Sequence, residues 1–316
     1  MIAVLTGGTG GAKFVDGLRK VVPPRELTFI VNTGDDFEWW GLHISPDVDS
    51  ITYVLSDLLS KERGWGVDGD TFQCLEAMKR LGEPAWFQIG DRDLSTHLRR
   101  THLLREGKTL CEATAEITKS LGIESTVLPM TNSPVETRVT IPEGEISFQD
   151  YFVRRRFRDP VNSVRFSGAE NSSAAPGVVD AILSAEMILL APSNPVTSIG
   201  PILAVSGIRK ALQDSTAPIG AVSPIVGGAA VSGPAGALMA AQKLPVSVAG
   251  VAEAYQDFLD FLIVDSADAE ASQLFTNARL EMYSTNTIMK TNDDRTELAR
   301  AVVSFASDSK KLKVAS

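Results

Sequence analysis

Four glycines, a threonine and a lysine lie close together near the start of the chain, in the sequence Gly-Gly-Thr-Gly-Gly-Ala-Lys at residues 7–13. An apolar run at residues 2–5, typical of a buried strand, precedes them, and apolar residues with helical spacing follow. Glycines let backbone N–H groups approach an anion closely, and the dipole of a helix N-terminus favours negative charge there. The loop therefore predicts a phosphate or diphosphate site, to which Lys13 adds a positive charge.

Two well-known phosphate-binding loops differ from this sequence. Phe14 follows Lys13, so no hydroxyl is placed for Mg²⁺ as it would be in a P-loop. The dinucleotide fingerprint fits Gly8 and Gly10 but needs a third glycine where Lys13 stands. A tight turn that binds nothing is the alternative, although a strand, glycine-rich loop and helix at the start of an α/β chain usually bind an anion.

Four carboxylates fall on two loops within fifteen residues. Asp35 and Asp36 follow a second apolar strand, and Asp47 and Asp49 belong to the sequence Ser-Pro-Asp-Val-Asp. Mg²⁺ binds one or two carboxylates and completes its shell with waters and phosphate oxygens, so the two loops together favour a metal or substrate site. The alternative is a set of solvent-exposed turn acids, with Asp49 as the N-cap of the next helix.

A second charged motif is Gly-Asp-Arg-Asp at residues 90–93. Arg92 could bind a phosphate or a ring carbonyl while a neighbouring aspartate holds it in place. A surface salt-bridge cluster is the alternative. His97 follows one helical turn after Asp93, and we expect it to be a helix residue satisfied by a carboxylate.

Two further loops that follow apolar strands are rich in hydroxyl and amide groups, at residues 193–200 and 223–228. Such loops can read a base or bind a phosphate with neutral donors, and prolines and Gly200 constrain their shape. Each could be no more than a structured connection between a strand and a helix. Three loops of this kind at one sheet edge nevertheless predict a ligand.

Basic and aromatic residues give weaker indications. The arginines at positions 154, 155, 156 and 158 form a basic run that could touch an anionic substrate, although we expect most of its members to be solvated or at a dimer edge. Trp39 and Trp40 stand beside the acidic loop and could stack on a flat heterocycle, with core packing or a subunit contact as equal alternatives.

The elements that must position these residues recur in one pattern, an apolar strand followed by a polar or Gly/Pro loop and a helix. The pattern predicts an α/β, Rossmann-like fold with a doubly wound, mainly parallel sheet. Residues 125–160 interrupt it and predict a small β-rich insertion. We expect a single domain over residues 1–316, with the inserted subregion at about 125–175.

Composition narrows the function further. A net charge of −9 over 316 residues argues against a general nucleic-acid surface, and the longest apolar stretches are too broken for a membrane span. Two cysteines cannot form a disulfide framework, and no catalytic triad or zinc spacing is visible. Because the chain starts with a core strand, we expect no signal peptide and a cytoplasmic location.

Taken in order, these motifs resemble the 2-phospho-L-lactate transferase family, which acts in the biosynthesis of the deazaflavin coenzyme F-420. The resemblance extends from residue 2 to near residue 270. Besides the glycine loop it rests on Asn-Thr-Gly-Asp-Asp at 32–36, Ser-Pro-Asp-Val-Asp at 45–49, Gly-Asp-Arg-Asp at 90–93, Ala-Pro-Ser-Asn-Pro at 191–195, Ser-Ile-Gly-Pro at 198–201, Ser-Pro-Ile at 223–225, Gly-Pro-Ala at 233–235 and Tyr-Gln-Asp-Phe-Leu-Asp at 255–260.

The resemblance implies a specific reaction. A guanosine diphosphate-linked donor carries lactate or, in bacterial members, enolpyruvate, and the acceptor is the deazaflavin Fo. The terminal ribityl hydroxyl of Fo attacks the distal phosphorus, GMP leaves, and Mg²⁺ is required. Phosphate transfer of this kind depends on charge neutralisation and in-line positioning more than on a nucleophilic side chain.

The resemblance also implies roles for individual residues. The diphosphate would be held by Thr9, Gly10, Gly11 and Lys13, and the guanosine side by Asn194, Ser198 and Gly200. Asp36 and Asp49 are the first choices for Mg²⁺. Asp49 and Arg92 are also implied to face Fo and to act in catalysis, so Asp49 has two competing roles.

Two alternatives come from other classes of protein. A sister group of nucleotide-sugar-binding regulatory proteins has a similar glycine loop, but we expect it to lack the Ser-Pro-Asp-x-Asp and Gly-Asp-Arg-Asp motifs. A nicotinamide-dependent dehydrogenase is disfavoured by Lys13 and by the missing acid at the tip of the second strand. The expected partners are the donor, Fo and a second copy in a homodimer. Lactate and enolpyruvate donors are not separable from the sequence.

Overall fold

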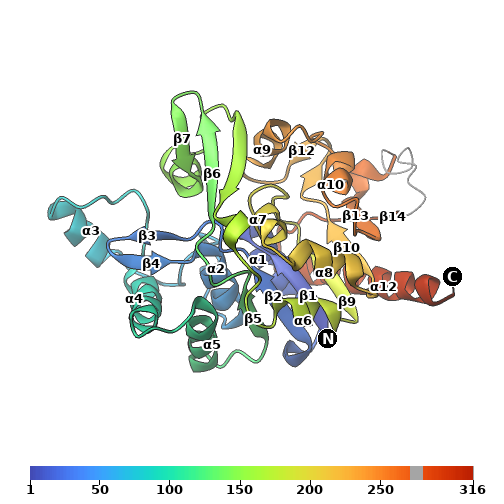
Figure 1. Ribbon diagram of the computed structural model, residues 1–316, viewed down its shortest axis with the longest axis horizontal. Coiled ribbons are helices and arrows are strands. Elements are labelled where there is room, and N and C mark those ends of the chain that lie inside the picture. Colours follow the sequence, from blue (N-terminus) through green and yellow to red (C-terminus); the bar gives the residue numbers. More distant parts are fainter. Residues whose placement is uncertain (271–279, 316) are drawn as a thin grey trace.

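The computed structural model describes residues 1–270 and 280–315, with side chains as far as residue 307. Among these residues, the centre is a seven-stranded sheet in which every neighbouring pair is parallel (Figure 1). The strands, in the order in which they lie side by side, are β14 (Glu281–Thr285), β13 (Phe261–Asp265), β10 (Ile219–Val222), β9 (Met187–Leu190), β1 (Ile2–Thr6), β2 (Leu27–Val31) and β5 (Thr126–Pro129). The chain starts in the middle of the sheet and adds strands on both sides.

Helices cover both faces of this sheet. One face carries α1 (Gly8–Leu18), α2 (Pro46–Leu55) and α12 (Asn292–Ala315). The other carries α6 (Val178–Leu183), α7 (Gly200–Ala204), α8 (Ile208–Asp214) and α10 (Val248–Ala254). Along β1, Ile2 and Val4 pack into the first core and Ala3 and Leu5 into the second, because successive side chains of a strand point to opposite faces. The predicted Rossmann-like, doubly wound α/β fold is confirmed.

The segment between β5 and α6 in the sequence forms a small antiparallel sheet, which lies at the top of Figure 1. Its strands lie in the order β7-β6-β8 and are β6 (Glu136–Ile141), β7 (Gly144–Ser147) and β8 (Ser163–Ser167). The short helical turn Asp150–Arg154 follows β7, and α9 (Ala235–Ala241) packs against β8. The predicted β-rich insertion is thus confirmed, but the start of the predicted region 125–160 forms β5, which belongs to the central sheet.

Two aspartates exchange caps between α3 (Gln73–Arg80) and α4 (Asp91–Arg105). Asp91 accepts hydrogen bonds from two backbone N–H groups in the first turn of α3, at 2.9 and 3.0 Å. Asp70 accepts from two backbone N–H groups in the first turn of α4, at 2.8 and 2.9 Å. The sequence pattern predicts a helix over residues 70–81 with Asp70 as its cap. The helix forms as α3, but Asp70 caps α4 instead, since the acceptor that a helix N-terminus needs can come from a distant residue.

Several elements near the acidic loops differ from the sequence pattern. β3 (Phe37–Trp39) and β4 (Leu42–Ile44) form a hairpin that was not predicted. Residues 84–89, for which the sequence pattern predicts a short strand or an extended segment, form no strand. A second short hairpin joins β11 (Ile225–Val226) to β12 (Ala229–Ala230), and α5 (Leu110–Ser120) begins with the capping residue Thr109. α2 starts at Pro46, so Asp49 lies within its first turn and is not its N-cap.

Candidate active site

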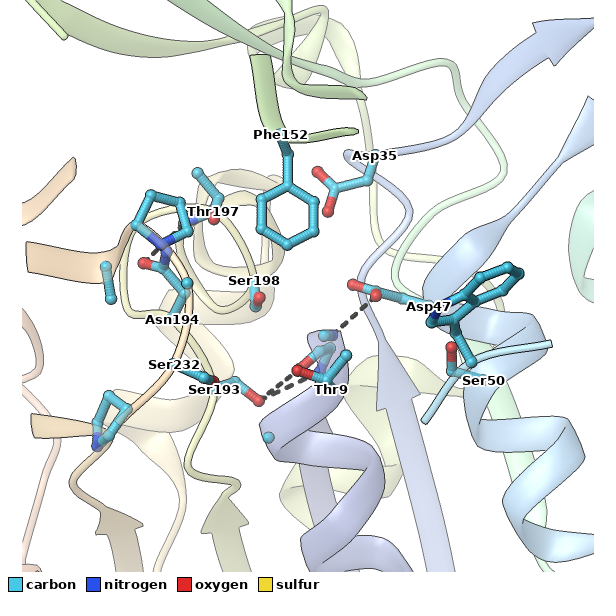
Figure 2. Close-up of a pocket in the computed structure, with 18 of the residues that line it drawn as sticks. Thr9, Asp35, Asp47, Ser50, Phe152, Ser193, Asn194, Thr197, Ser198 and Ser232 are labelled. Atoms are coloured by element: carbon cyan, nitrogen blue, oxygen red, sulfur yellow. Dashed lines mark hydrogen bonds between the residues drawn. The ribbon is translucent and has the colours of Figure 1, made fainter. Parts of the chain in front are cut away.

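A cavity of about 1000 Å³ lies at the carboxyl edge of the central sheet (Figure 2). Its floor is the first turn of α1 together with the loops that follow β9 and β10. Its walls come from segments far apart in the sequence, within residues 46–50, 86–88, 148–157, 231–235 and 287–290. A space of this size accommodates two small substrates side by side.

The glycine loop follows β1 closely because it has no side chains. A Cβ at Gly7 would lie 2.6 Å from Asp47 Oδ2, and one at Gly10 would collide with the carbonyl oxygen of Pro192. Gly8 has a φ of +66°, in the left-handed region that favours glycine. The loop sequence is therefore dictated by close packing beneath the cavity as well as by access to an anion.

Two buried polar residues tie the strand ends together. Ser193 Oγ donates to the carbonyl of Gly7 at 2.7 Å and so joins the loop after β9 to the glycine loop. Asn32 Nδ2, just after β2, donates to Asp47 Oδ2 at 2.9 Å and to the carbonyl of Thr197 at 3.3 Å. Neither Ser193 nor Asn32 was predicted individually to have this role. Their signal was a polar residue directly after a buried apolar strand.

The N-terminus of α1 faces the cavity. The backbone N–H of Gly8 donates to Asp47 Oδ1 at 2.7 Å, while those of Thr9 and Gly10 have no hydrogen-bond acceptor among the described residues. Lys13 lines the same side of the cavity. Unpaired N–H groups, the helix dipole and a lysine together form an anion-binding site.

Two acids share the cavity with this site. Burial raises the pKa of Asp47 to about 6, and the charge of Asp36 adds to the rise, although hydrogen bonds from Asn32 and Gly8 oppose it. Burial, together with the charges of Asp47 and Asp36, also holds the pKa of Asp35 well above its usual value. Asp35 Oδ1 is buried without a hydrogen-bond partner in the described part of the chain. Neither acid forms an ion pair with a cationic side chain that the structure describes, which is the situation that a bound cation would relieve.

Asp36 and Asp49, the acids predicted to hold the metal, lie outside the cavity lining. Asp36 Oδ2 accepts from Ser45 Oγ at 2.6 Å and contacts His43 Nε2 at 3.1 Å. Asp49 forms a buried two-point ion pair with Arg100. Side chains two positions apart on a helix point about 200° apart, so α2 cannot turn both Asp47 and Asp49 to the cavity.

Arg92 also lies outside the lining. It is exposed on the first turn of α4, and its Nη1 donates to the carbonyl of Asp68 at 2.7 Å. Its neighbour Asp93 is buried and accepts from Tyr53 Oη at 2.6 Å, with His97 at 3.3 Å. His97 is thus a helix residue beside carboxylates, as predicted, while the predicted contacts of Asp49 and Arg92 with an acceptor stay predictions.

The residues predicted to bind the donor divide into two groups. Thr9, Gly10, Lys13, Asn194 and Ser198 line the cavity. Gly11 and Gly200 lie outside the lining. Close packing accounts for the glycine at both positions. A Cβ at Gly11 would collide with Thr6 and crowd Ser193, and one at Gly200 would lie 2.8 Å from the ring of Phe166.

The aromatic residues beside the acidic loop form a small core of their own. Trp39 is buried there together with Phe37, Trp86 and Phe87, and Trp40 packs against it. Trp86 and Phe87 line the cavity, whereas Trp39 and Trp40 do not. Core packing, one of the two alternatives left open for Trp39, is what the structure shows.

Comparison with known proteins identifies the family. The family model for 2-phospho-L-lactate transferase CofD matches residues 2–306. The chain belongs to the 2-phospho-L-lactate transferase family. Its members transfer phosphate-containing groups, so this chain is placed among transferases and not among dehydrogenases.

Similar proteins named 2-phospho-L-lactate transferase occur in methanogenic archaea. The protein from Methanosarcina mazei is 41% identical over 300 residues, which cover 95% of this chain and 98% of that protein. The protein from Methanocaldococcus jannaschii is 41% identical over 310 residues, covering 96% of this chain and 98% of that protein. The family match over residues 2–306 includes every segment that lines the cavity.

Solved structures support the fold alone. BH3568 from Bacillus halodurans, described as a member of the UPF0052 family, superposes with a TM-score of 0.63 at 17% sequence identity. The match covers 96% of this chain and 98% of that chain.

The structure also bears on metal binding and on membrane insertion. Within residues 1–270 and 280–315, no group of three or more His, Cys, Asp or Glu side chains is placed to hold a metal ion. Mg²⁺ needs only one or two protein carboxylates when phosphates supply other ligands, so Asp35 and Asp47 fit that ion.

Among residues 1–270 and 280–315, no helix has the length and apolar character of a membrane span.

Proposed function

We propose that this protein transfers a 2-phospholactyl group from a guanosine diphosphate-linked donor to the ribityl hydroxyl of the deazaflavin Fo, in the biosynthesis of coenzyme F-420. The observation that carries the proposal is the cavity in which the anion-binding N-terminus of α1 meets two acids without a cation. The names of the archaeal relatives favour lactate over enolpyruvate in the donor.

The donor diphosphate would lie on the first turn of α1. The free N–H groups of Thr9 and Gly10 and the ammonium of Lys13 face that position. The guanosine would extend along the loop after β9, where Asn194 and Ser198 line the cavity. Ser193, bonded to Gly7, would keep these two loops in register.

Asp35 and Asp47 are proposed as the residues that hold Mg²⁺, in place of the predicted pair Asp36 and Asp49. Both line the cavity, and their raised pKa values and the unpartnered Asp35 oxygen reflect a missing positive charge. When bound, Mg²⁺ would neutralise charge on the phosphate oxygens.

The reaction balances without a covalent enzyme intermediate. The ribityl oxygen of Fo bonds to the distal phosphorus, the bond from that phosphorus to the bridging oxygen breaks, GMP leaves, and the hydroxyl proton is released. The protein would orient the two substrates in line, with the acceptor ring against the side lined by Trp65, Trp86 and Phe87.

A direct assay tests this proposal. Purified protein incubated with Fo, lactyl-2-diphospho-5′-guanosine and Mg²⁺ should form GMP and a phosphorylated deazaflavin in equal amounts. Mass spectrometry measures both products. Absence of product, together with calorimetric binding of a UDP-sugar and no response to Fo, would contradict the transferase proposal and favour a regulatory protein.

A further inference from the structure

One turn of the chain above the cavity has an unusual backbone. Arg156 and Phe157 are consecutive non-glycine residues with φ values of +55° and +45°. Left-handed conformations are unfavourable for residues with a side chain, so the surrounding structure must enforce them. The N–H of Phe157 donates to the carbonyl of Tyr151 at 2.8 Å and thereby closes the turn.

Three aromatic rings hold this turn over the cavity. Phe148 and Phe152 stack with ring centroids 5.4 Å apart, and Phe152 and Phe157 stack at 5.6 Å. Phe157 keeps 44% of its surface exposed, and all three rings line the cavity. Figure 2 shows the ring of Phe152 pointing into the cavity from the side opposite the first turn of α1.

The strained turn separates one arginine from its neighbours. Arg154 and Arg155 both pair with Asp150, and Arg155 also pairs with Asp159. Arg156 lines the cavity and has no ion-pair partner within the described residues. One member of the arginine run, although exposed, therefore borders the candidate active site, where contact with an anionic substrate was one of the predictions for the run.

A second anionic group of the substrate needs a cation in this cavity. In the proposed reaction the transferred group carries a carboxylate as well as phosphate. Asp35 and Asp47 would repel that carboxylate, so it must lie away from them. The cavity-lining cations in the described part of the chain are Lys13, which serves the diphosphate, Arg156 and Lys290.

We propose that Arg156 binds the carboxylate of the transferred group and so selects donors that carry one. The inference rests on the proposed function and names a specificity residue within it. A guanidinium offers two parallel N–H groups to a carboxylate, which the ammonium of Lys290 cannot do. Phe152 and Phe157, on the same turn, provide an apolar wall for the carbon atoms next to that carboxylate.

The test compares two donors in steady-state kinetics with Fo. The first is lactyl-2-diphospho-5′-guanosine, and the second is guanosine diphosphate β-ethyl ester, in which a simple ethyl group replaces lactate. Arg156→Ala should lower kcat/KM for the first donor about 10- to 100-fold, the usual effect of losing a charge-assisted contact. The same variant should change kcat/KM for the ethyl ester, and the affinity for GDP, less than about threefold.

Three further variants make the result decisive. Arg156→Lys keeps the charge and should recover only part of the loss with the lactyl donor, because the two-point contact is gone. Arg154→Ala, which removes a paired arginine outside the cavity lining, should leave both donors unaffected. Lys290→Ala should show no selective loss.

Each contrary outcome has a distinct meaning. An equal loss with both donors would show a structural role and overturn the proposal, as would selective loss in Lys290→Ala instead of Arg156→Ala. Unchanged kinetics of Arg156→Ala with the lactyl donor would also overturn it. Failure of the proposed function itself would appear earlier, as absence of transfer by the wild-type protein with either donor.

Discussion

Two groups of buried acids lie on or beside α2 and behave in opposite ways. Asp49 is paired with Arg100, and Asp93 contacts His97 and Tyr53. Asp35 and Asp47 are equally buried but line the cavity, and within the described residues neither forms an ion pair. Burial alone would raise the pKa of Asp93, yet its contacts with His97, Tyr53 and Arg100 hold that pKa below its usual value, whereas the pKa values of Asp35 and Asp47 are raised.

The comparison teaches that burial does not by itself distinguish a structural carboxylate from a functional one. A structural acid already has its positive partner within the fold, and a functional acid waits for one from a ligand. One functional and one structural acid lie on α2 only two residues apart. Their side chains differ in direction because Asp47 and Asp49 point to nearly opposite sides of the helix.

The largest effect is expected when the buried ion pair of Asp49 and Arg100 is broken. Arg100→Met removes the guanidinium from the buried carboxylate of Asp49 and leaves it only the longer contact with His97 Nδ1 at 3.5 Å. The variant should lower the free energy of unfolding by about 3–5 kcal/mol, measured by urea denaturation. Arg99→Ala is the matched control, because Arg99 forms an exposed pair with Glu116 and should cost about 0–1 kcal/mol. The double variant Asp49→Leu/Arg100→Met should recover most of the stability. Equal stability of Arg100→Met and Arg99→Ala would contradict the structural assignment.

Next comes a change in the unpaired group. Asp47→Asn removes the charge from the cavity and should lower turnover by about 10²- to 10³-fold, the usual effect of losing one electrostatic contact in a transition state. The measurement is kcat with the guanosine donor and Fo. Asp57→Asn, at the exposed end of α2, should retain activity. Turnover of Asp47→Asn near the wild-type rate would remove Asp47 from the mechanism.

Metal removal sharpens the same comparison. Treatment with a chelator should abolish turnover, and added Mg²⁺ should restore it, because the cavity acids have no cation of their own. Mg²⁺ should also raise the Tm of the wild-type protein by ligand-linked stabilisation, and it should raise that of Asp47→Asn less. An equal rise in both proteins would mean that the metal binds elsewhere.

The smallest effect concerns pH. The pKa of Asp47 is raised to about 6 in the folded protein, so its contribution to stability is present at low pH and is lost as pH rises through 6. In metal-free buffer, the Tm of Asp47→Asn relative to that of the wild type should therefore rise by a few degrees between pH 5 and pH 7.5. The direction of this change is the readout, since the variant also loses an acceptor for Asn32. A pH-independent difference would show that Asp47 does not titrate in that interval.

Much of the architecture could be predicted because it follows from local periodicity. The apolar strands, the glycine loop after β1 and the polar loops after β9 and β10 were all visible in the sequence, and the carboxyl ends of parallel strands necessarily meet at one edge. The hairpin of β3 and β4 was missed because its strands are only three residues long. The caps supplied by Asp70 and Asp91 were missed because each acts on a helix distant in the sequence.

The sequence by itself determined that a doubly wound sheet would place a phosphate-binding loop, several acids and polar loops at one edge, and it carried the motifs of the transferase family. Only the tertiary structure decided which acids line the cavity, that Ser193 and Asn32 join the strand ends, and that Arg156, unlike Arg154 and Arg155, borders the cavity. The physical reason is that spacing along the chain sets which residues share an element. The direction of a side chain and the partner that neutralises it depend on segments that only folding brings together.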